Sequence, residues 1–411
     1  MNIAMKPIQL LVLISLVGVC SFEPACLASE DVPNDSTTIQ TGADQTDLYI
    51  DYLKGKRVAV LANPTTIIGK KHLVDSLISR DINIVKAFGP EHGFRGNASN
   101  GARVDDEKDS ATNIKIISLY GAKRKPSKAD LADVDIMIFD IQDVGCRFYT
   151  YINVLRDVME ACAENNKELM ILDRPNPNGY LVDGPILDMR LKSGIGQFPI
   201  PIAHGMTVGE FAQMINGEGW MAGESKCQLK IIPVANYNHD MLYTLPVKPS
   251  PNLNTQQSIM LYPSTCLFEG TILSQGRGTY MPFTVLGSPA LKGLYSFSFT
   301  PISIPGMKEA PLHMNDTCYG IDLRDYDIDQ LIRTKRINIQ WMIDLYKIYP
   351  EKDKFFDRTQ SREIGNIDVL AGVYDFRQQI IAGKSMQEIQ TSWEPGLSRY
   401  KGMRKKYMLY P

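Results

Sequence analysis

Short apolar runs alternate with amphipathic stretches over much of the chain. Four of these runs carry almost no polar side chains, and they fall at residues 57–61, 82–88, 135–139 and 168–172. Strands that are apolar on both faces are typical of a parallel sheet covered by helices on its two sides. The pattern therefore predicts βαβ units and an α/β fold with a mostly parallel sheet.

Two less regular apolar runs add further expected strands. Residues 198–203 predict a fifth strand, and residues 231–234 predict an edge strand, where a proline is tolerated. Thr207 with Glu210, and Ser385 with Glu388, have the spacing of capping boxes, so we expect helices to begin there. Pro395 should kink or interrupt the last helix.

The pattern changes after residue 285. Pro- and Phe-rich strands follow, and then helices near residues 328–349 and 368–382. A chain of 411 residues is also long for one domain. We expect a catalytic α/β domain over residues 48–285 and a smaller α+β domain over residues 286–411.

The N-terminal residues have the character of an export signal. Lys6 precedes an apolar run over residues 10–20, and small residues follow up to Ala28. This pattern predicts a signal peptide over residues 1–28, too short to span a bilayer as a mature helix, and then a solvated linker over residues 29–47. A lipid anchor on Cys20 or Cys26 is the alternative. We expect an exported, periplasmic protein with no membrane span in the mature chain.

Composition and missing motifs exclude several functions. A net charge of −2 gives no field that would attract nucleic acid. The cysteines after residue 28 are five in number and widely scattered, which does not suit a disulfide framework or a cysteine-based metal site. The chain lacks the glycine-rich dinucleotide and P-loop motifs, the zincin motif and the serine-hydrolase elbow. We therefore predict no metal and no cofactor.

Polar residues gather where the expected strands end. Ligands of open parallel sheets bind outside the carboxyl ends of the strands, so these residues are candidates for a site. The candidates in the five loops are Asn63, Glu91, His92, Arg95, Asp140, Gln142, Asp143, Arg147, Tyr149, Asp173, Asn176 and His204.

The loop over residues 89–94 contains the strongest candidate. Gly89, Pro90 and Gly93 turn the backbone sharply around Glu91, so its carboxylate can lie at the floor of a cleft, where it would suit a general acid. His92 could act on a substrate or simply bond a carbonyl.

The remaining candidates have two interpretations each. Asp140, Asp143, Arg147 and Tyr149 have the composition of a sugar pocket, but an Asp–Arg pair could equally fix the loop. The turn chemistry around Asp173 and Asn176 explains most of their loop. Later in the chain, Asn252 and Asn254 would point the same way on an extended segment. Glu269 and Arg277 could supply a second carboxylate and a carboxylate-binding guanidinium, or a loop-fixing ion pair.

Four motifs together resemble the NamZ family of exo-β-N-acetylmuramidases. They are Gly-Pro-Glu-His-Gly-Phe-Arg-Gly at 89–96, Asp-Ile-Gln-Asp-Val-Gly-Cys-Arg-Phe-Tyr-Thr-Tyr at 140–151, Asp-Arg-Pro-Asn-Pro at 173–177 and Ser-Pro-Asn-Leu-Asn-Thr at 250–255. The resemblance runs from about residue 57 to 410. It implies a Rossmann-like domain, a smaller C-terminal domain and an active site in the cleft between them, with the catalytic glutamate at Glu91.

The resemblance also implies a substrate. It points to cell-wall recycling, in which N-acetylmuramic acid is released from the non-reducing end of peptidoglycan fragments. Arg277 or Arg147 would then suit the lactyl carboxylate of the sugar, and Asn252 and Asn254 its acetamido group.

Glycosidases ordinarily use two carboxyl groups. The partner of Glu91 would be Asp143, Asp140 or Glu269, unless the substrate's own acetamido group takes that place. A non-catalytic muropeptide-binding protein is the alternative function, and a sugar-modifying transferase or lyase is a third.

Overall fold

The main sheet has seven strands in the computed structural model, which describes residues 38–91, 93–95, 107–356 and 367–411. Their order across the sheet is β5-β6-β4-β1-β7-β8-β9, and only the β5–β6 pair is antiparallel. If the parallel strands are numbered by their order in the chain, they lie across the sheet in the order 3-2-1-4-5-6, which is the Rossmann order. The strands are β1 (Val58–Ala62), β4 (Ile84–Gly89), β5 (Glu107–Lys108), β6 (Lys115–Ser118), β7 (Ile136–Asp140), β8 (Glu168–Leu172) and β9 (Gln228–Ile232).

The four apolar runs are strands β1, β4, β7 and β8, as predicted, and β9 is an edge strand that begins three residues before the predicted start. The fifth predicted strand is wrong. In residues 198–203 only Ala203 forms β-bridges, to Cys146 and Asp183. Pro199 and Pro201 lack the N–H groups that a ladder needs, so an apolar run with alternating prolines cannot join the sheet.

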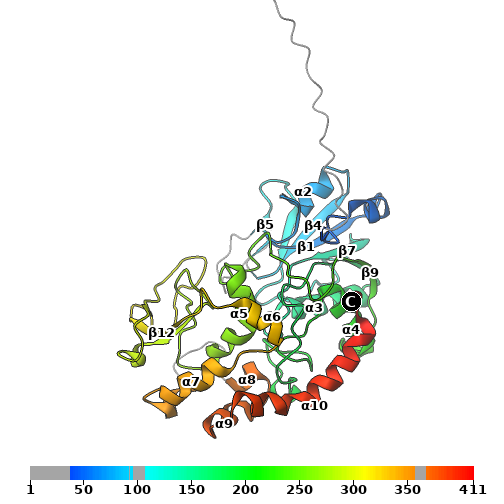
Figure 1. Ribbon diagram of the computed structural model, residues 1–411. Helices are drawn as coiled ribbons and strands as arrows, with labels where there is room; N and C mark the ends of the chain where they lie inside the picture. Colours follow the sequence, from blue (N-terminus) through cyan, green and yellow to red (C-terminus); the bar gives the residue numbers. More distant parts are fainter. Residues whose placement is uncertain (1–37, 92, 96–106, 357–366) are drawn as a thin grey trace, which may run out of the picture. The chain divides into compact units, whose positions relative to one another are not determined.

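Alternate residues of each central strand enter two different cores. Ala59 and Leu61 of β1 pack with α3 (Tyr151–Glu164) and α4 (Val208–Gly217). Val58 and Val60 pack on the other face with α1 (Ile50–Leu53) and α2 (Leu73–Ile78). The sheet is therefore covered on both faces, as expected for apolar parallel strands (Figure 1).

The C-terminal part is a smaller α+β region. Its three-stranded antiparallel sheet has the order β10-β12-β11. Its elements are α5 (Gln256–Thr265), β10 (Val285–Ser288), β11 (Ser298–Phe299), β12 (Cys318–Asp322), α6 (Ile328–Thr334), α7 (Gln340–Ile348), α8 (Ile367–Ala371), α9 (Phe376–Ile381) and α10 (Met386–Arg404).

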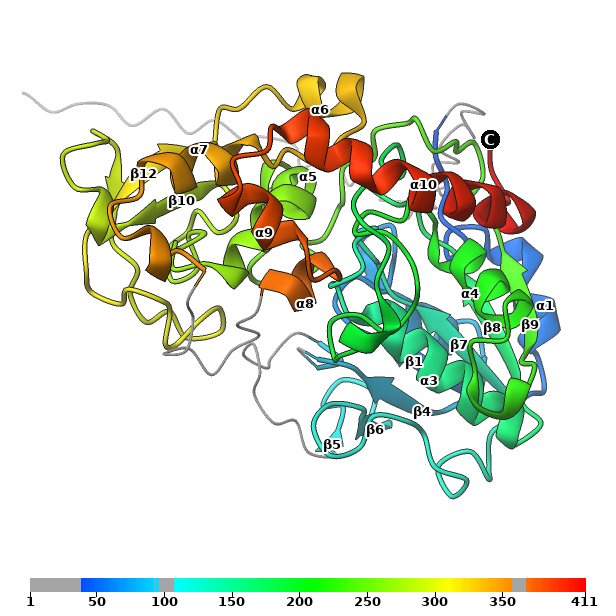
Figure 2. The ribbon, with the colours of Figure 1, turned by 90° about the horizontal axis from the view of Figure 1, so that it is seen from below.

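This region shares a core with the main sheet. Leu345 of α7 and Trp393 of α10 belong to the same buried cluster as Leu61 of β1. Helix α10 runs back toward α4 (Figure 2), and residues 39–411 form one compact unit. The two predicted domains are therefore joined by a continuous core.

Helix ends follow local chemistry in most places. The capping boxes at Thr207 and Ser385 are both formed. The stretches expected as helices near 328–349 and 368–382 are each divided, by the left-handed Lys335 and by Gly372 with φ +82°. Helix α10 continues through Pro395, so the helix is not interrupted there and the missing N–H is tolerated; a kink at Pro395 stays a prediction.

The described part of the predicted linker is folded. Gln40 pairs with Ala235 beyond the edge strand, and Ala43 is fully buried. Polar composition over residues 39–47 therefore reflects turns packed on the sheet rather than a solvated chain. The predicted signal peptide and residues 29–37 lie outside the described residues. Within the described ranges, no helix has the length and apolar character to cross a membrane.

Candidate active site

The carboxyl ends of β1 and β7 meet where the strand order reverses. Strands β1 and β7 are direct neighbours, although two parallel strands separate them in the chain. Their loops are hydrogen-bonded to each other, because Thr66 Oγ1 donates to the Asp140 carbonyl and Gln142 N donates to Thr65 Oγ1 at 3.0 Å. This is the position at which ligands bind in doubly wound sheets.

Asn63 connects three elements at this point. Its Oδ1 accepts hydrogen bonds from the backbone N and the hydroxyl of Thr65, at 2.9 and 2.6 Å. Its Nδ2 donates to the hydroxyl of Tyr151 at 3.0 Å. That hydroxyl lies 3.5 Å from the carbonyl oxygen of Glu91. The structure thus brings together Asn63, Glu91 and a tyrosine that begins α3.

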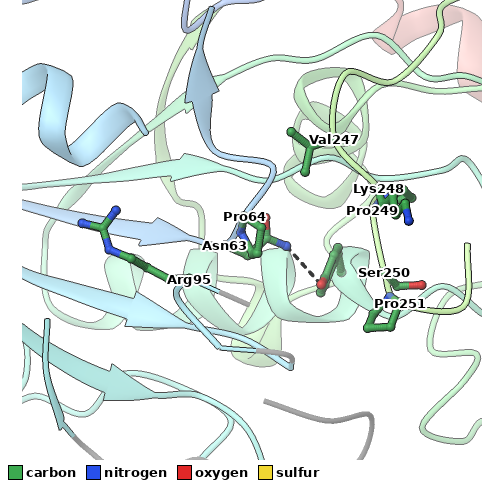
Figure 3. Close-up of a pocket in the computed structure, with 9 residues that line it drawn as sticks. Asn63, Pro64, Arg95, Val247, Lys248, Pro249, Ser250 and Pro251 are labelled. Carbon is green, nitrogen blue, oxygen red and sulfur yellow. Dashed lines mark hydrogen bonds between the residues drawn. The ribbon is translucent and has the colours of Figure 1, made fainter. Parts of the chain in front are cut away.

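A cavity of about 320 Å³ opens beside these residues. It is lined by Asn63, Pro64, Arg95, Tyr151, Val247, Lys248, Pro249, Ser250 and Pro251. Figure 3 shows the segment 247–251 facing Asn63 and Pro64. Tyr149 holds that segment in place, because its hydroxyl donates to the Pro249 carbonyl at 2.7 Å. The two aromatic rings Tyr149 and Tyr151 pack edge to face, 5.0 Å apart.

Glu91 is half-buried in a tight turn. Gly93 N donates to Pro90 O at 3.0 Å, and Gly93 has φ +77°, a conformation that favours glycine. Burial raises the pKa of Tyr151, and the charge of Glu91 raises it further. Burial and the same charge raise the pKa of Tyr120. The charge of Glu91 therefore acts on two phenol groups, one of which, Tyr151, lines the cavity, although Glu91 itself is not among the lining residues. His92 lies outside the described residues.

Asp143 is the second carboxylate near these rings. Its Oδ2 accepts from Gly145 N at 2.7 Å and lies 3.6 Å from His204 Nε2. Its Oδ1 is buried and has no hydrogen-bond partner among the described residues. Burial, then Tyr151, Asp143 and Glu91, raise the pKa of Tyr149. The charges of both carboxylates thus raise the pKa of the same phenol, and neither carboxylate is among the residues that line the cavity.

His204 lies against Asp143 although its own segment is not a strand. Its Nδ1 accepts from Met206 N at 3.2 Å, which places the ring proton on Nε2, facing Asp143. Both side chains are buried.

Three residues predicted to bind substrate instead hold the loops together. Asp140 is fully buried and paired with Arg174 Nε at 2.5 Å. Gln142 Nε2 donates to the carbonyls of Asp143 and Pro175, at 2.8 and 2.7 Å. Arg147 is buried, and its guanidinium donates to four backbone carbonyls, those of Pro185, Ile200, Leu370 and Ala371. Burial lowers its pKa to about 9.

Asp173 and Asn176 are also structural. Asp173 accepts hydrogen bonds from Thr207, Gly209, Arg174 and Tyr410. Burial raises its pKa to about 6. Asn176 Nδ2 donates to Met206 O at 3.0 Å, and its Oδ1 accepts from Asn178 N at 2.8 Å. The side chain of Asn176 also fills the space beside Gly145.

The other predicted residues are divided between the cavity rim and the C-terminal region. Arg95 lines the cavity, but its guanidinium is paired with Asp75 and Asp109, at 2.8 and 2.7 Å, and points away from the segment 247–251 (Figure 3). Glu269 and Arg277 form an ion pair at 2.7 Å, which is the loop-fixing interpretation.

The two asparagines of the motif at 250–255 both bond carbonyls. Asn252 Nδ2 donates to Met307 O and Asn254 Nδ2 to Tyr280 O, each at 3.1 Å. Their Oδ1 atoms are buried without a hydrogen-bond partner among the described residues. The amides therefore fix the loop that follows the cavity wall.

Two cavity residues were not among the predicted site residues: Lys248, and Tyr151, which sequence reasoning placed only as aromatic surface beside the loop of Asp140, Asp143 and Arg147. Tyr151 lies in a quoted motif, and its position at the start of α3 beside a strand end is the signal that could have selected it. Nothing in the sequence marks Lys248. Cys146 does not suit a nucleophile, because it is fully buried and burial raises the pKa of its thiol. The described residues contain no group of three or more metal-ligating side chains that could hold an ion.

Comparisons with known proteins agree along the whole folded chain. Residues 58–257 match the family model for the N-terminal part of the exo-β-N-acetylmuramidase NamZ, and residues 260–410 match the model for its C-terminal part. The peptidoglycan β-N-acetylmuramidase NamZ of Bacillus subtilis is 37% identical over 94% of this chain and 95% of its own length.

Two solved structures from Bacteroides fragilis, both of DUF1343 family proteins, share the fold. One has a TM-score of 0.82 with 46% identity, over 91% of this chain and 99% of its own. The other has a TM-score of 0.75 with 28% identity, over 91% of this chain and 100% of its own. The Rossmann-ordered sheet, the smaller C-terminal region and the matched motifs lead to one conclusion: the chain belongs to the NamZ family of glycosidases.

Proposed function

We propose that this protein releases N-acetylmuramic acid from the non-reducing end of peptidoglycan fragments, with Glu91 as the general acid and base. The observation that carries the proposal is the half-buried Glu91 after β4, whose backbone carbonyl lies 3.5 Å from the hydroxyl of Tyr151 in the wall of a cavity of about 320 Å³. That volume lies at the lower end of small-ligand sites, which suits one sugar ring better than a long glycan chain. The named activity of the B. subtilis relative supports the substrate.

The environment of Glu91 suits proton transfer to a glycosidic oxygen. The phenol of Tyr120 interacts with the Glu91 side chain, and Tyr151 connects the Glu91 loop to Asn63. In the proposed first step the Glu91 carboxyl group gives its proton to the leaving oxygen while the bond to the anomeric carbon breaks. In the second step the Glu91 carboxylate takes a proton from the attacking water.

The second catalytic group is proposed to be the substrate's acetamido oxygen. Among the described candidates, Asp140 is paired with Arg174 and Glu269 with Arg277. Asp143 is 5% exposed, and its Oδ2 accepts a hydrogen bond from Gly145 N. The acetamido oxygen would attack the anomeric carbon as the leaving oxygen departs, forming a cyclic intermediate that water opens. Two displacements at one carbon retain its configuration.

The Glu91→Gln substitution tests the central proposal. We expect normal folding and a fall of about a thousandfold in kcat on a chromogenic N-acetyl-β-muraminide, because the amide cannot transfer the proton. Glu168→Gln, a change at a half-buried glutamate at the start of β8, should leave kcat unchanged. Retained activity in Glu91→Gln would remove Glu91 from this role.

Product analysis tests the rest of the proposal. Free N-acetylmuramic acid with retained configuration is expected by NMR spectroscopy during turnover. An inverted product would exclude participation of the acetamido group. Heat of binding without any product would identify a muropeptide-binding protein, and a product other than the free sugar would identify a transferase or lyase.

We further propose that the protein is exported and acts on fragments in the periplasm. The support is the signal-like pattern of residues 1–28 together with the cell-wall substrate. Fractionation of cells that express the full chain, with mass spectrometry of the mature N-terminus, distinguishes cleavage after Ala28 from lipid attachment at Cys20 or Cys26.

A further inference from the structure

The cavity wall contains two cations, and only one of them is free to meet a ligand. Arg95 is held by Asp75 and Asp109, each through two hydrogen bonds, so its charge is already balanced. Lys248 is exposed and forms neither a hydrogen bond nor an ion pair with any residue that the structure describes. None of the nine lining residues is an aspartate or a glutamate. Lys248 is therefore a cation that none of the residues lining the cavity neutralises.

The backbone that carries Lys248 is held on both sides. On one side, Tyr149 donates to the carbonyl of the next residue, Pro249, at 2.7 Å. On the other, Gln256 Nε2 donates to Tyr243 O at 3.3 Å, and its Oε1 accepts from Leu245 N at 3.4 Å. Fixed backbone on both sides lowers the entropy cost of placing the lysine at a ligand.

The other basic candidates are committed elsewhere. Arg147 is buried and bonded to four carbonyls, and Arg277 is paired with Glu269. Lys248 is therefore the cation of the cavity wall that can pair with a small anionic group entering the cavity. A lysine binds a carboxylate as a point charge through charge-assisted hydrogen bonds.

We propose that Lys248 binds the lactyl carboxylate of N-acetylmuramic acid, and so distinguishes this sugar from N-acetylglucosamine, which lacks that group. The inference rests on the proposed function for the identity of the sugar. Its own physical basis is the unpaired lysine in a cavity wall without carboxylates.

Binding of the free sugar tests the inference without any need for turnover. Calorimetry would compare N-acetylmuramic acid with its lactyl carboxamide, on the wild type and on Lys248→Gln. A charge-assisted hydrogen bond corresponds to at least a tenfold change in Kd. We expect the wild type to bind the acid about tenfold more tightly than the amide, and Lys248→Gln to bind the two equally. A variant that keeps the preference for the acid would overturn the inference.

Two further variants sharpen the assignment. Lys70→Gln removes an exposed lysine from the neighbouring groove, which shares Pro64 and Arg95 with the cavity. This variant should keep the preference for the acid over the amide. If Lys70→Gln loses that preference, the summed positive charge of this face, rather than Lys248, produces it. Lys248→Arg should keep the preference, because the positive charge remains.

Kinetics separate this inference from the proposed function. On a chromogenic muraminide, Lys248→Gln should raise KM about tenfold and leave kcat close to the wild-type value. A wild type that binds the acid selectively but releases no sugar would refute the hydrolase and leave the role of Lys248 intact. A wild type that hydrolyses the acid and its amide equally well would support the hydrolase and refute the role of Lys248.

Discussion

The cavity wall and the buried polar layer behind it both contain basic side chains, yet these side chains differ in how their hydrogen bonds are satisfied. In the buried layer, Arg174 is paired with Asp140, and Arg147 is bonded to four carbonyls. In the wall, Lys248 has no partner among the described residues, and the Tyr151 hydroxyl stands at a long 3.5 Å from the Glu91 carbonyl. Residue type alone therefore does not separate a basic side chain that holds loops together from one that is available to a ligand.

The largest expected effect is on the buried side of this comparison. Arg147→Met should lower the free energy of unfolding by about 3 kcal/mol or more, because it leaves buried carbonyls without donors between the sheet region and α8. Urea unfolding followed by circular dichroism measures the change. Arg333→Met, at an exposed ion pair, should cost at most about 1 kcal/mol. If Arg147→Met were as stable as the wild type but no longer bound the sugar, Arg147 would be a ligand-binding residue rather than a structural one.

A smaller effect is expected in the wall, and it should appear in activity. Tyr151→Phe removes the hydroxyl that joins Asn63 to the Glu91 loop, so kcat should fall about tenfold while the free energy of unfolding changes by about 1 kcal/mol or less. Steady-state kinetics on the muraminide together with urea unfolding measure the two quantities.

Tyr180→Phe is the matched control for this substitution. Tyr180 is a buried tyrosine whose hydroxyl has no hydrogen-bond partner among the described residues. Its removal should change neither quantity. Equal losses of activity in both variants would mean that the Tyr151 hydroxyl has no special role.

Most of the sheet could be predicted from the sequence. Strands β1, β4, β7 and β8 are buried on both faces, which leaves a nearly continuous apolar run as their signature. Strand β5 has two residues, and β6 has four with an exposed lysine at its start, so neither leaves such a run. The apolar run at 198–203 has the same signature as a strand, but its prolines prevent a ladder.

The site was predictable at its centre and not at its margins. Asn63 and Glu91 follow strand ends, and that position alone selects them. The same reasoning selected Arg147. Its hydrogen-bond partners lie 38 to 224 residues away along the chain, so its burial depends on tertiary packing that the local sequence does not reveal. Lys248 follows no strand of the sheet. It reaches the cavity because Tyr149, about a hundred residues earlier, holds the next carbonyl.

The smallest expected effect concerns pH and the buried layer. Burial raises the pKa of Asp173 to about 6, so the folded chain holds a proton there that the unfolded chain has already released. The stabilising contribution of this protonated group is complete below a pH of about 4 and is lost as the pH rises through about 6. Between pH 5 and 7.5 the wild type should lose about 1 kcal/mol relative to Asp173→Asn, whose amide mimics the protonated carboxyl group.

Urea unfolding of both proteins at the two pH values measures this difference. The Asp173 side chain accepts from Thr207 and Tyr410, two hydroxyls that can rotate to suit an amide, so the variant should fold. Parallel pH dependences in the two proteins would mean that Asp173 is ionised over the whole range, held by its four donors against the cost of burial. Asp173 would then be a further charged member of the buried layer, beside the Asp140–Arg174 ion pair, and its hydrogen bonds alone would keep it ionised.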